Sequence, residues 1–405
     1  MTTEKRRPGV LIVVENLSMP ADRRVWTEAQ TLVSAGYRVS TISPTGRQHD
    51  KGLHERRDGV EIYRYPAPPL TSGALSFLVE FVYCWLATLV LSVVIAVREG
   101  FDIFQACNPP ETFWIIGRLY QMLGKRFIFD HHDLSPEMYE ARFEKKGALY
   151  KVLLWLERMT YRSADALIAV NEHVAQIAGT RCGVPPQSIA VVRSGPDPEA
   201  LKPLSPDTSL KGGRRWMVCF LGVMNPQDGV DVLIGAADHL VHQLGYDDVL
   251  FALMGDGDSL EALRTMCKEL GLERHVRFTG WADMDMIRAY LSVADVCVDP
   301  IPLTAYSKFG AFNKIMEYMS MARPIVAFDL PGTRWMAEDA ALYAQPNDTH
   351  DLAEKIACLL RDEELRRSMG QKGRRRIEEA LGWPQQSQAY LQAYDKVVHR
   401  NSDKV

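Results

Sequence analysis

Short apolar runs alternate with longer amphipathic stretches along most of this chain, and this alternation constrains its fold more than any other feature. Helical spacing is found in stretches such as Val25–Ala35, Phe113–Leu123 and Leu149–Ser163. Strands that alternate with helices are typical of a parallel sheet covered on both faces, so we predict an α/β fold. The first group of expected strands comprises Val10–Val14, Arg38–Ile42, Val60–Arg64, Ile103–Ala106, Phe127–Phe129, Ala166–Val170 and Ala190–Val192.

The alternation breaks once, at Pro196–Gly213, which is rich in Pro, Ser, Asp and Gly and is the best candidate linker. A length of 405 residues accommodates two domains of about 200 residues each. We predict doubly wound domains over 1–200 and 201–383, and a terminal helix within 384–405 that packs back on the first domain. The second group of expected strands comprises Met217–Leu221, Val249–Met254, Val276–Thr279, Val296–Val298 and Ile325–Phe328.

Charge and cysteine content exclude several classes of function. A net charge of -4 gives no excess of Lys and Arg for nucleic-acid phosphates, so no nucleic-acid partner is expected. The seven cysteines are scattered singly without a C-x-x-C pair. This pattern indicates neither a disulfide framework nor a zinc site, and it fits a reducing cytoplasm.

One uncharged segment, Phe81–Val97, allows three interpretations. A buried helix is the favoured one, and a helix lying at a membrane surface is the second. A membrane span is the third, because 17 residues are marginal for crossing about 30 Å of hydrocarbon. The basic residues Lys5–Arg7 and the uncharged run together motivate a peripheral membrane contact through 74–98.

Neither half of the chain carries the glycine pattern of a dinucleotide-binding oxidoreductase. The turn after the first strand is Glu15–Pro20, and the corresponding turn of the second half is Gly222–Pro226. A pyrophosphate held as in dehydrogenases requires G-x-G-x-x-G at such a turn, so hydride-transfer chemistry is disfavoured.

Two segments of the second half carry residues suited to a nucleotide. Gly255 and Gly257 end a strand, where they either let the backbone approach a ligand or simply permit a tight turn. A helix then starts near Asn313. Its Glu317 can accept ribose hydroxyls, and Lys314 with Lys308 can meet a diphosphate. For an isolated helix, however, a solvated face is the favoured interpretation of these residues.

The order of these pieces resembles the retaining GT-B glycosyltransferases of the large family 4, over nearly the whole chain. Residues 249–330 carry the most specific likeness: GDG, V-R-F-T-G, A-D-V, N-K-I-M-E-Y-M and R-P-I-V follow in the family's order. The first half agrees through Asp22–Val25 with Glu28, Gly36–Val39 and Asp130–Leu134. The resemblance implies two facing Rossmann-like domains with a cleft between them.

The resemblance also assigns roles to residues. Glu317 matches the second glutamate of the family's E-x7-E signature, which holds the donor ribose, and His132 matches the histidine near the anomeric carbon. Together with Lys314 they form the expected catalytic set. Donor contacts are expected from Arg193 in the hinge segment Arg193–Asp197 and from Gly222, Gln227, Gly255, Gly257, Lys308, Phe309, Gly310 and Asn313. Acceptor contacts are expected from Arg23, Arg24 and Asp133.

Two positions depart from the family. The first glutamate of the signature falls at Phe309, and the turn after Leu221 lacks the usual Arg and Lys. A front-face, retaining transfer without cofactor or metal is nevertheless the leading interpretation. Its expected partners are a nucleotide sugar and a polyprenyl-linked or other glycan acceptor, at the cytoplasmic face of the plasma membrane. A sugar-nucleotide 2-epimerase and a non-catalytic nucleotide-sugar-binding relative are the alternatives.

Overall fold

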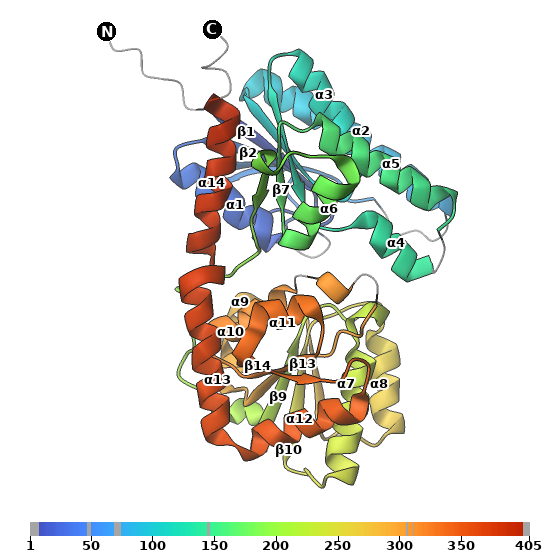
Figure 1. Ribbon diagram of the computed structural model, residues 1–405, viewed down its shortest axis with the longest axis vertical. Coiled ribbons are helices and arrows are strands. Elements are labelled where there is room, and N and C mark those ends of the chain that lie inside the picture. The colour runs from blue at the N-terminus through green and yellow to red at the C-terminus, as the bar shows by residue number, and fades with distance from the viewer. Residues whose placement is uncertain are drawn as a thin grey trace. The chain divides into compact units, whose positions relative to one another are not determined.

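The computed structural model describes residues 8–46, 50–68, 74–143, 146–304, 307–310 and 312–399, with the side chains of 74–78, 141–143 and 399 left out. Lys5–Arg7 and Tyr306, which figured in the sequence interpretation, lie outside these residues. The chain forms two compact units (Figure 1). One runs to Arg193 and includes the chain from Ser387 on, and the other is Ser194–Gln386.

The N-terminal unit is built on an eight-stranded sheet with the order β3-β4-β2-β1-β5-β6-β7-β8. Its strands are β1 Gly9–Val13, β2 Arg38–Pro44, β3 His54–Arg57, β4 Val60–Tyr65, β5 Ile103–Cys107, β6 Arg126–His131, β7 Ala166–Ala169 and β8 Ile189–Val191. Its helices are α1 Arg23–Ser34, α2 Ala74–Arg98, α3 Trp114–Met122, α4 Ser135–Phe143, α5 Ala148–Ser163 and α6 Glu172–Cys182, with short 3-10 turns at Glu111–Phe113 and Pro186–Ser188.

The two faces of this sheet are covered by different helices. Side chains of α2, α3, α5 and α6 join one apolar core with alternate strand residues such as Phe104 and Phe127. The intervening residues, among them Gln105 and Asp130, point to the opposite face, because side chains alternate along a strand. There Gln105 accepts a hydrogen bond from Tyr390 of the terminal helix α14, Trp383–His399.

The C-terminal unit contains a six-stranded sheet with the order β11-β10-β9-β12-β13-β14, whose strand pairs are all parallel. The strands are β9 Trp216–Leu221, β10 Val249–Met254, β11 Val276–Gly280, β12 Val296–Asp299, β13 Ile325–Phe328 and β14 Ala341–Ala344. The helices are α7 Val230–Asp238, α8 Leu260–Glu269, α9 Met284–Val293, α10 Asn313–Ser320, α11 Pro331–Ala337, α12 Thr349–Arg361 and α13 Glu363–Arg376. Shorter turns lie at Thr208–Lys211, Pro226–Asp228, His239–Gln243, Ser307–Phe309, Glu338–Ala340 and Ile377–Leu381.

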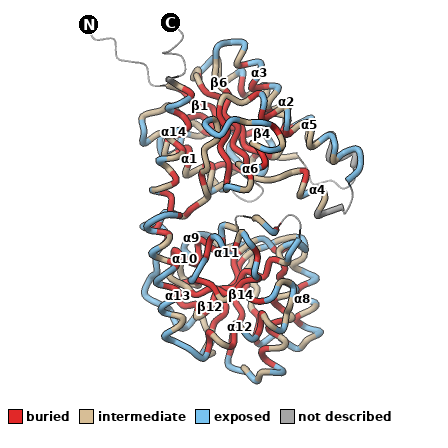
Figure 2. Tube along the Cα trace, in the orientation of Figure 1, coloured by how far each residue is buried: buried red, intermediate tan, exposed pale blue. Residues whose placement is uncertain are grey.

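Both faces of this second sheet are also covered. Helices α7, α8 and α12 pack on one face, and α9, α10 and α11 pack on the other. The strands of both units are buried along most of their lengths, while exposed stretches follow the outer helices (Figure 2). The predicted α/β fold of two Rossmann-like domains is thus confirmed.

Two strands were not predicted, and one of them corrects the expected all-parallel arrangement. Strand β3 pairs antiparallel with β4 through the turn at Asp58–Gly59, and its sequence, HERR, lacks the apolar residues of a buried strand. As an edge strand it has no need of them. Strand β14 is the other, with only four residues.

The favoured interpretation of Phe81–Val97 as a buried helix is wrong. Helix α2 does span this segment, but only 22% of its most apolar stretch is buried. Residues such as Val90 and Val97 are exposed, so one face of the helix packs on the sheet and the other is left uncovered.

Candidate functional site

Predicted donor residues of the C-terminal unit come together where three neighbouring strands end. Gly222 follows β9, Gly255 follows β10, and Asp299 is the last residue of β12. Parallel strands place their carboxyl ends at one edge of a sheet, which is where such folds bind ligands. The Gly222 amide donates to the carbonyl of Met254 at 3.0 Å, so the first two turns are joined directly.

The glycines of this edge are required by the neighbouring backbone. A Cβ atom on Gly255 would lie 1.8 Å from the carbonyl oxygen of Gly222, and one on Gly257 would lie 2.6 Å from that of Met224. Gly255 also has a φ of +143°, which favours glycine. The turn interpretation therefore accounts for both glycines, and their contact with a ligand stays a prediction.

Lys314 is the most unusual side chain of this edge. It lies in the first turn of α10 and is only 8% exposed. Its ammonium group is 3.4 Å from Asp299 Oδ1 and 4.8 Å from the ring centre of Phe220. Neither Lys314 Nζ nor Asp299 Oδ1 has a hydrogen bond to the residues that the structure describes. A buried ammonium without hydrogen bonds is costly, so the group is suited to an anionic ligand.

Two carboxyl groups, those of Asp299 and Asp228, interact electrostatically with Lys314. Burial raises the pKa of Asp299, and the ammonium of Lys314 opposes that rise. Burial likewise raises the pKa of Asp228, against the influence of the same ammonium. There is also little space between Gly222 and Lys314, because a Cβ atom on Gly222 would lie 3.4 Å from Lys314 Nζ. Positive charge is therefore held close to the turn after β9, where the sequence itself supplies no Arg or Lys.

The remaining predicted donor residues lie around this edge with different exposures. Glu317, one turn along α10 from Asn313, is buried at 7% exposure. Lys308 is exposed, with its ammonium 5.3 Å from the ring centre of Phe309. The other two are Gly310, which contacts Gly332 at the start of α11, and Gln227, which is exposed in the turn before α7.

In the N-terminal unit, His132 directly follows strand β6 and is tied to a carboxylate. Its Nε2 lies 2.8 Å from Oδ2 of Asp130, a fully buried residue, and its backbone amide donates to Asn108. Arg24 Nε lies 3.1 Å from the same ring nitrogen. The His132 ring is therefore held through Nε2, between the carboxylate of Asp130 and the guanidinium of Arg24.

The two arginines predicted to bind an acceptor lie in different environments. Arg23 is exposed at the start of α1. The Arg24 side chain is 7% exposed, and its guanidinium donates to Asp130 at 2.9 Å and to the carbonyl of Val192 at 2.9 Å. Arg24 also forms an ion pair with Glu28 at 3.0 Å. The structure therefore favours Arg23 over Arg24 as the residue that meets an acceptor.

Charges within this buried cluster are balanced internally. Burial and the charge of Asp130 raise the pKa of Glu28 well above its usual value, against the influence of Arg24. The pKa of Asp130 is lowered despite burial, because Arg24 and His132 stabilise its charge. Arg24 thus stabilises the charge of Asp130 and opposes the rise in the pKa of Glu28.

Gln105, a residue that sequence reasoning missed, connects this cluster to the terminal helix. Its Nε2 donates to Glu28 at 2.9 Å and to Asp130 at 3.4 Å. Its Oε1 accepts from the hydroxyls of Tyr390, at 2.9 Å, and Tyr394. The sequence did contain a signal for the importance of Gln105, because it is a polar residue inside the apolar run Ile103–Cys107.

The last two predicted residues lie in the N-terminal unit. The Asp133 carbonyl accepts hydrogen bonds from the His131 ring at 2.9 Å and from the Asn108 amide. Arg193 forms an ion pair with Glu172 of α6. Arg193 and the donor residues around Lys314 belong to different units, so a contact of Arg193 with the donor stays a prediction.

One group of side chains in the described chain has the composition of a metal site. Ligand atoms of Cys107, Asp130 and His132 lie within 4.8 Å of one another. Burial raises the pKa of the Cys107 thiol, and the Asp130 oxygens already accept from Arg24, Gln105 and His132. These atoms fit a hydrogen-bonded cluster better than a cation, and the expected absence of a metal stays a prediction.

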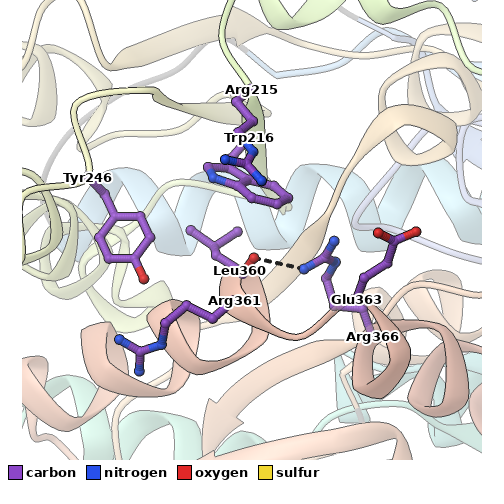
Figure 3. Close-up of a pocket in the computed structure, with 7 residues that line it drawn as sticks. All are labelled: Arg215, Trp216, Tyr246, Leu360, Arg361, Glu363 and Arg366. Atoms are coloured by element: carbon purple, nitrogen blue, oxygen red, sulfur yellow. Dashed lines mark hydrogen bonds between the residues drawn. The ribbon is translucent and has the colours of Figure 1, made fainter.

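A hollow of about 330 Å³ lies at the opposite edge of the C-terminal sheet (Figure 3). Trp216 begins β9, so this hollow is near the amino ends of the strands and away from Lys314. The guanidinium groups of Arg215 and Arg366 lie 4.5 and 4.9 Å from the Trp216 ring centre. Arg366 also donates to the carbonyls of Leu359 and Leu360, so its charge is already engaged.

Family comparisons agree with this geometry. Residues 21–195 match the description "Glycosyl transferase 4-like domain", and residues 215–362 match "Glycosyl transferases group 1". The two matched ranges correspond to the two units and together cover most of the chain. The chain is a GT-B glycosyltransferase of family 4.

Individual relatives of this glycosyltransferase include the alpha-maltose-1-phosphate synthase of Mycolicibacterium smegmatis, 29% identical over 70% of this chain and 76% of that protein. Among solved structures, sucrose-phosphate synthase from Thermosynechococcus elongatus superposes with a TM-score of 0.78 at 19% identity, over 97% of this chain and all of that one. Anabaena HepE in complex with UDP-glucose gives 0.70 at 17% identity, over 96% and 99% of the two chains. Both structures share the fold.

Proposed function

We propose that this glycosyltransferase takes its sugar from a nucleotide-diphosphate donor held at the carboxyl edge of the C-terminal sheet. The observation that carries the proposal is the buried ammonium of Lys314, which lacks hydrogen bonds to the described residues. A diphosphate oxygen would supply those bonds and the compensating charge. The UDP-glucose complex of HepE, a protein of the same fold, supports a donor of this class.

Each donor residue has a separate task in this proposal. Glu317 accepts the ribose hydroxyls, while Lys314 and Lys308 stabilise the departing diphosphate. The amide groups at the start of α10 assist, because Phe312, the residue before the helix, provides no side-chain cap. Neutralising the leaving group without a metal is sufficient for such a reaction.

The reaction proposed is a front-face transfer that retains the anomeric configuration. Its transition state has oxocarbenium character, as in glycoside hydrolysis. His132 orients the sugar near its anomeric carbon, while Asp130 and Arg24 hold its ring through Nε2. Arg23, with Asp133, contacts the acceptor.

A lipid-linked glycan, such as a polyprenyl-diphosphate sugar, is the proposed acceptor in polysaccharide or glycolipid synthesis. An anionic acceptor of this kind suits the exposed Arg23, and a lipid tail suits the long apolar helix α2. The enzyme would then act at the cytoplasmic face of the plasma membrane.

Donor binding is tested with UDP-, GDP-, ADP- and dTDP-sugars in a thermal-shift assay on the wild type and on Lys314→Met. We expect one base to raise the melting temperature of the wild type, and we expect the variant to lose that increase. Equal stabilisation of both proteins would refute the assignment of Lys314.

Turnover separates the proposal from its alternatives. Release of nucleoside diphosphate that depends on an added polyprenyl-diphosphate sugar indicates a transferase. Product formed without an acceptor would indicate epimerase or hydrolase chemistry instead, and binding without any turnover would indicate a non-catalytic relative.

A further inference from the structure

Helix α2 buries small side chains and exposes larger apolar ones, which is the reverse of the usual arrangement for a helix on the surface of a soluble domain. The residues it buries include Cys84, Thr88 and Ser92, which are small and partly polar. Valine and leucine side chains are exposed instead, up to 82% at Val97. They follow helical spacing along one stripe: Val79, Val82, Leu86, Val90, Val93 and Val97.

Helices α3 and α5, which share a core with α2, also expose apolar side chains. Helices α2, α3 and α5 contribute to the same core on one face of the sheet, and the Tyr120 hydroxyl of α3 donates to Ser92 of α2 at 2.9 Å. The rings of Trp114 and Trp155 join α3 to α5 at 6.3 Å. Further exposed apolar side chains on α3 and α5 are Ile115, Leu119, Met122, Leu149, Val152 and Trp155. We call the exposed apolar side chains of these three helices the apolar helix surface.

The exposed charges on the three helices of the apolar helix surface have a single sign. Among the described residues of α2, α3 and α5, the exposed charged side chains are all basic. The acidic residues, Glu80 and Glu157, are partly or fully buried. The basic residues are Arg98, Arg118, Lys151, Arg158 and Arg162.

We propose that the apolar helix surface docks on a lipid bilayer that contains anionic lipids. Contiguous exposed apolar patches mark interaction sites, and the surrounding basic side chains complement anionic headgroups. A second copy of the chain is a poorer occupant, because a symmetric contact would bring the same basic residues of both copies together.

Docking on the membrane surface accounts for α2 better than a membrane span does. The stretch Val79–Arg98 is long and apolar enough to span, with a mean hydropathy of 2.1. However, Cys84, Thr88, Ser92 and Ile95 are all buried against the sheet or its helices. A span would expose these contacts and break the bond from Tyr120, whereas a helix lying at the interface keeps them.

This inference deepens the proposed function, because it rests on a lipid-linked acceptor that is reached from the bilayer surface. Membrane binding and donor binding can fail independently. Nucleotide-sugar binding measured without vesicles tests the proposed function alone, and vesicle binding measured without nucleotide tests the surface alone.

The test is flotation of the full chain with vesicles of phosphatidylcholine, with and without phosphatidylglycerol. We expect the wild type to float with the anionic vesicles and to be released as the salt concentration rises. Val90→Glu/Val97→Glu should reduce the bound fraction at least about tenfold, since each exchange places a charge where a valine would enter the interface. The matched control Leu204→Glu/Met284→Glu changes two exposed apolar residues of the C-terminal unit and should bind as the wild type does.

Melting temperatures and UDP-sugar binding without vesicles confirm that the variants are folded. A wild type that stays with the soluble fraction, or a Val90→Glu/Val97→Glu variant that still floats, would overturn the proposal. So would a dimer that the same variant dissociates in the absence of lipid. Loss of flotation by the control variant would place the docking surface elsewhere and refute it equally.

Discussion

Each unit of the enzyme buries a cation near the carboxyl ends of its strands, but among the described residues only the cation of the N-terminal unit has hydrogen bonds. In the N-terminal unit, Arg24 is bound by Asp130, Glu28 and a backbone carbonyl. In the C-terminal unit, Lys314 faces Asp299 at 3.4 Å without a hydrogen bond among the described residues. A satisfied cluster fixes structure, whereas an unsatisfied cation is suited to a ligand. Burial alone therefore does not distinguish a scaffold charge from a binding charge.

Removing Arg24 should produce the largest effect on stability. Arg24→Met would leave Asp130 buried without its partner, and breaking a buried pair in this way costs about 3–5 kcal/mol of unfolding free energy. Urea denaturation measures this loss, with the exposed Arg23→Met as the control, which should change stability by less than about 0.5 kcal/mol. If Arg24→Met and Arg23→Met lost similar amounts of unfolding free energy, Arg24 would not be a structural charge, and the contrast with Lys314 would fail.

Removing Lys314 should affect catalysis more than stability. Lys314→Met is expected to lower turnover at least about 100-fold, as the loss of a charge-stabilising group does. The free energy of unfolding should change by less than it does in Arg24→Met, because Lys314 has an ion pair with Asp299 but no hydrogen bond to the described residues. Lys268→Met, an exposed lysine of the same unit, is the control. A variant that unfolds readily while turnover per folded molecule persists would make Lys314 structural.

The two charged residues of α10 should be separable by the part of the donor that they bind. Glu317→Gln is expected to weaken nucleoside diphosphate binding by about 10- to 100-fold, the value of hydrogen bonds to a charged group. It should leave inorganic pyrophosphate binding unchanged, whereas Lys314→Met should weaken both ligands. Calorimetric titration distinguishes the two patterns, and equal weakening of pyrophosphate by Glu317→Gln would contradict the ribose assignment.

The smallest effect is a pH dependence that belongs to Glu28. Its raised pKa in the folded state means that its stabilising contribution is present below about pH 4.5 and declines as pH rises toward the folded value. Relative to the wild type, Glu28→Gln should therefore gain about 1.4 kcal/mol for each pH unit within that window. Unfolding free energies of both proteins between pH 4 and 8 measure the difference. A constant difference across this range would show that Glu28 is charged in the folded cluster.

Local sequence patterns predicted most of the architecture, because apolar runs and helical spacing report burial directly. Lys314 could be singled out from its place at a helix start, and its diphosphate contact stays a prediction. The role of Gln105 could not, since its partners Tyr390 and Tyr394 lie almost three hundred positions away in the chain. The exposure of α2 was also hidden, because an apolar helix has the same sequence pattern whether protein or lipid covers it.

The division of the chain has a consequence for its synthesis on the ribosome. The N-terminal unit needs Tyr390 and Tyr394 of α14 to complete the hydrogen bonds of Gln105, yet Ser194–Gln386 is translated first. At about 5–20 residues per second this delay is on the order of 10–40 s. During that interval Gln105 lacks the two tyrosine hydroxyl groups that donate to it, and α14 does not yet pack over Gln105 and its charged neighbours. A chain that stalls before α14 would therefore carry a first unit in which Gln105 lacks these two hydroxyl partners.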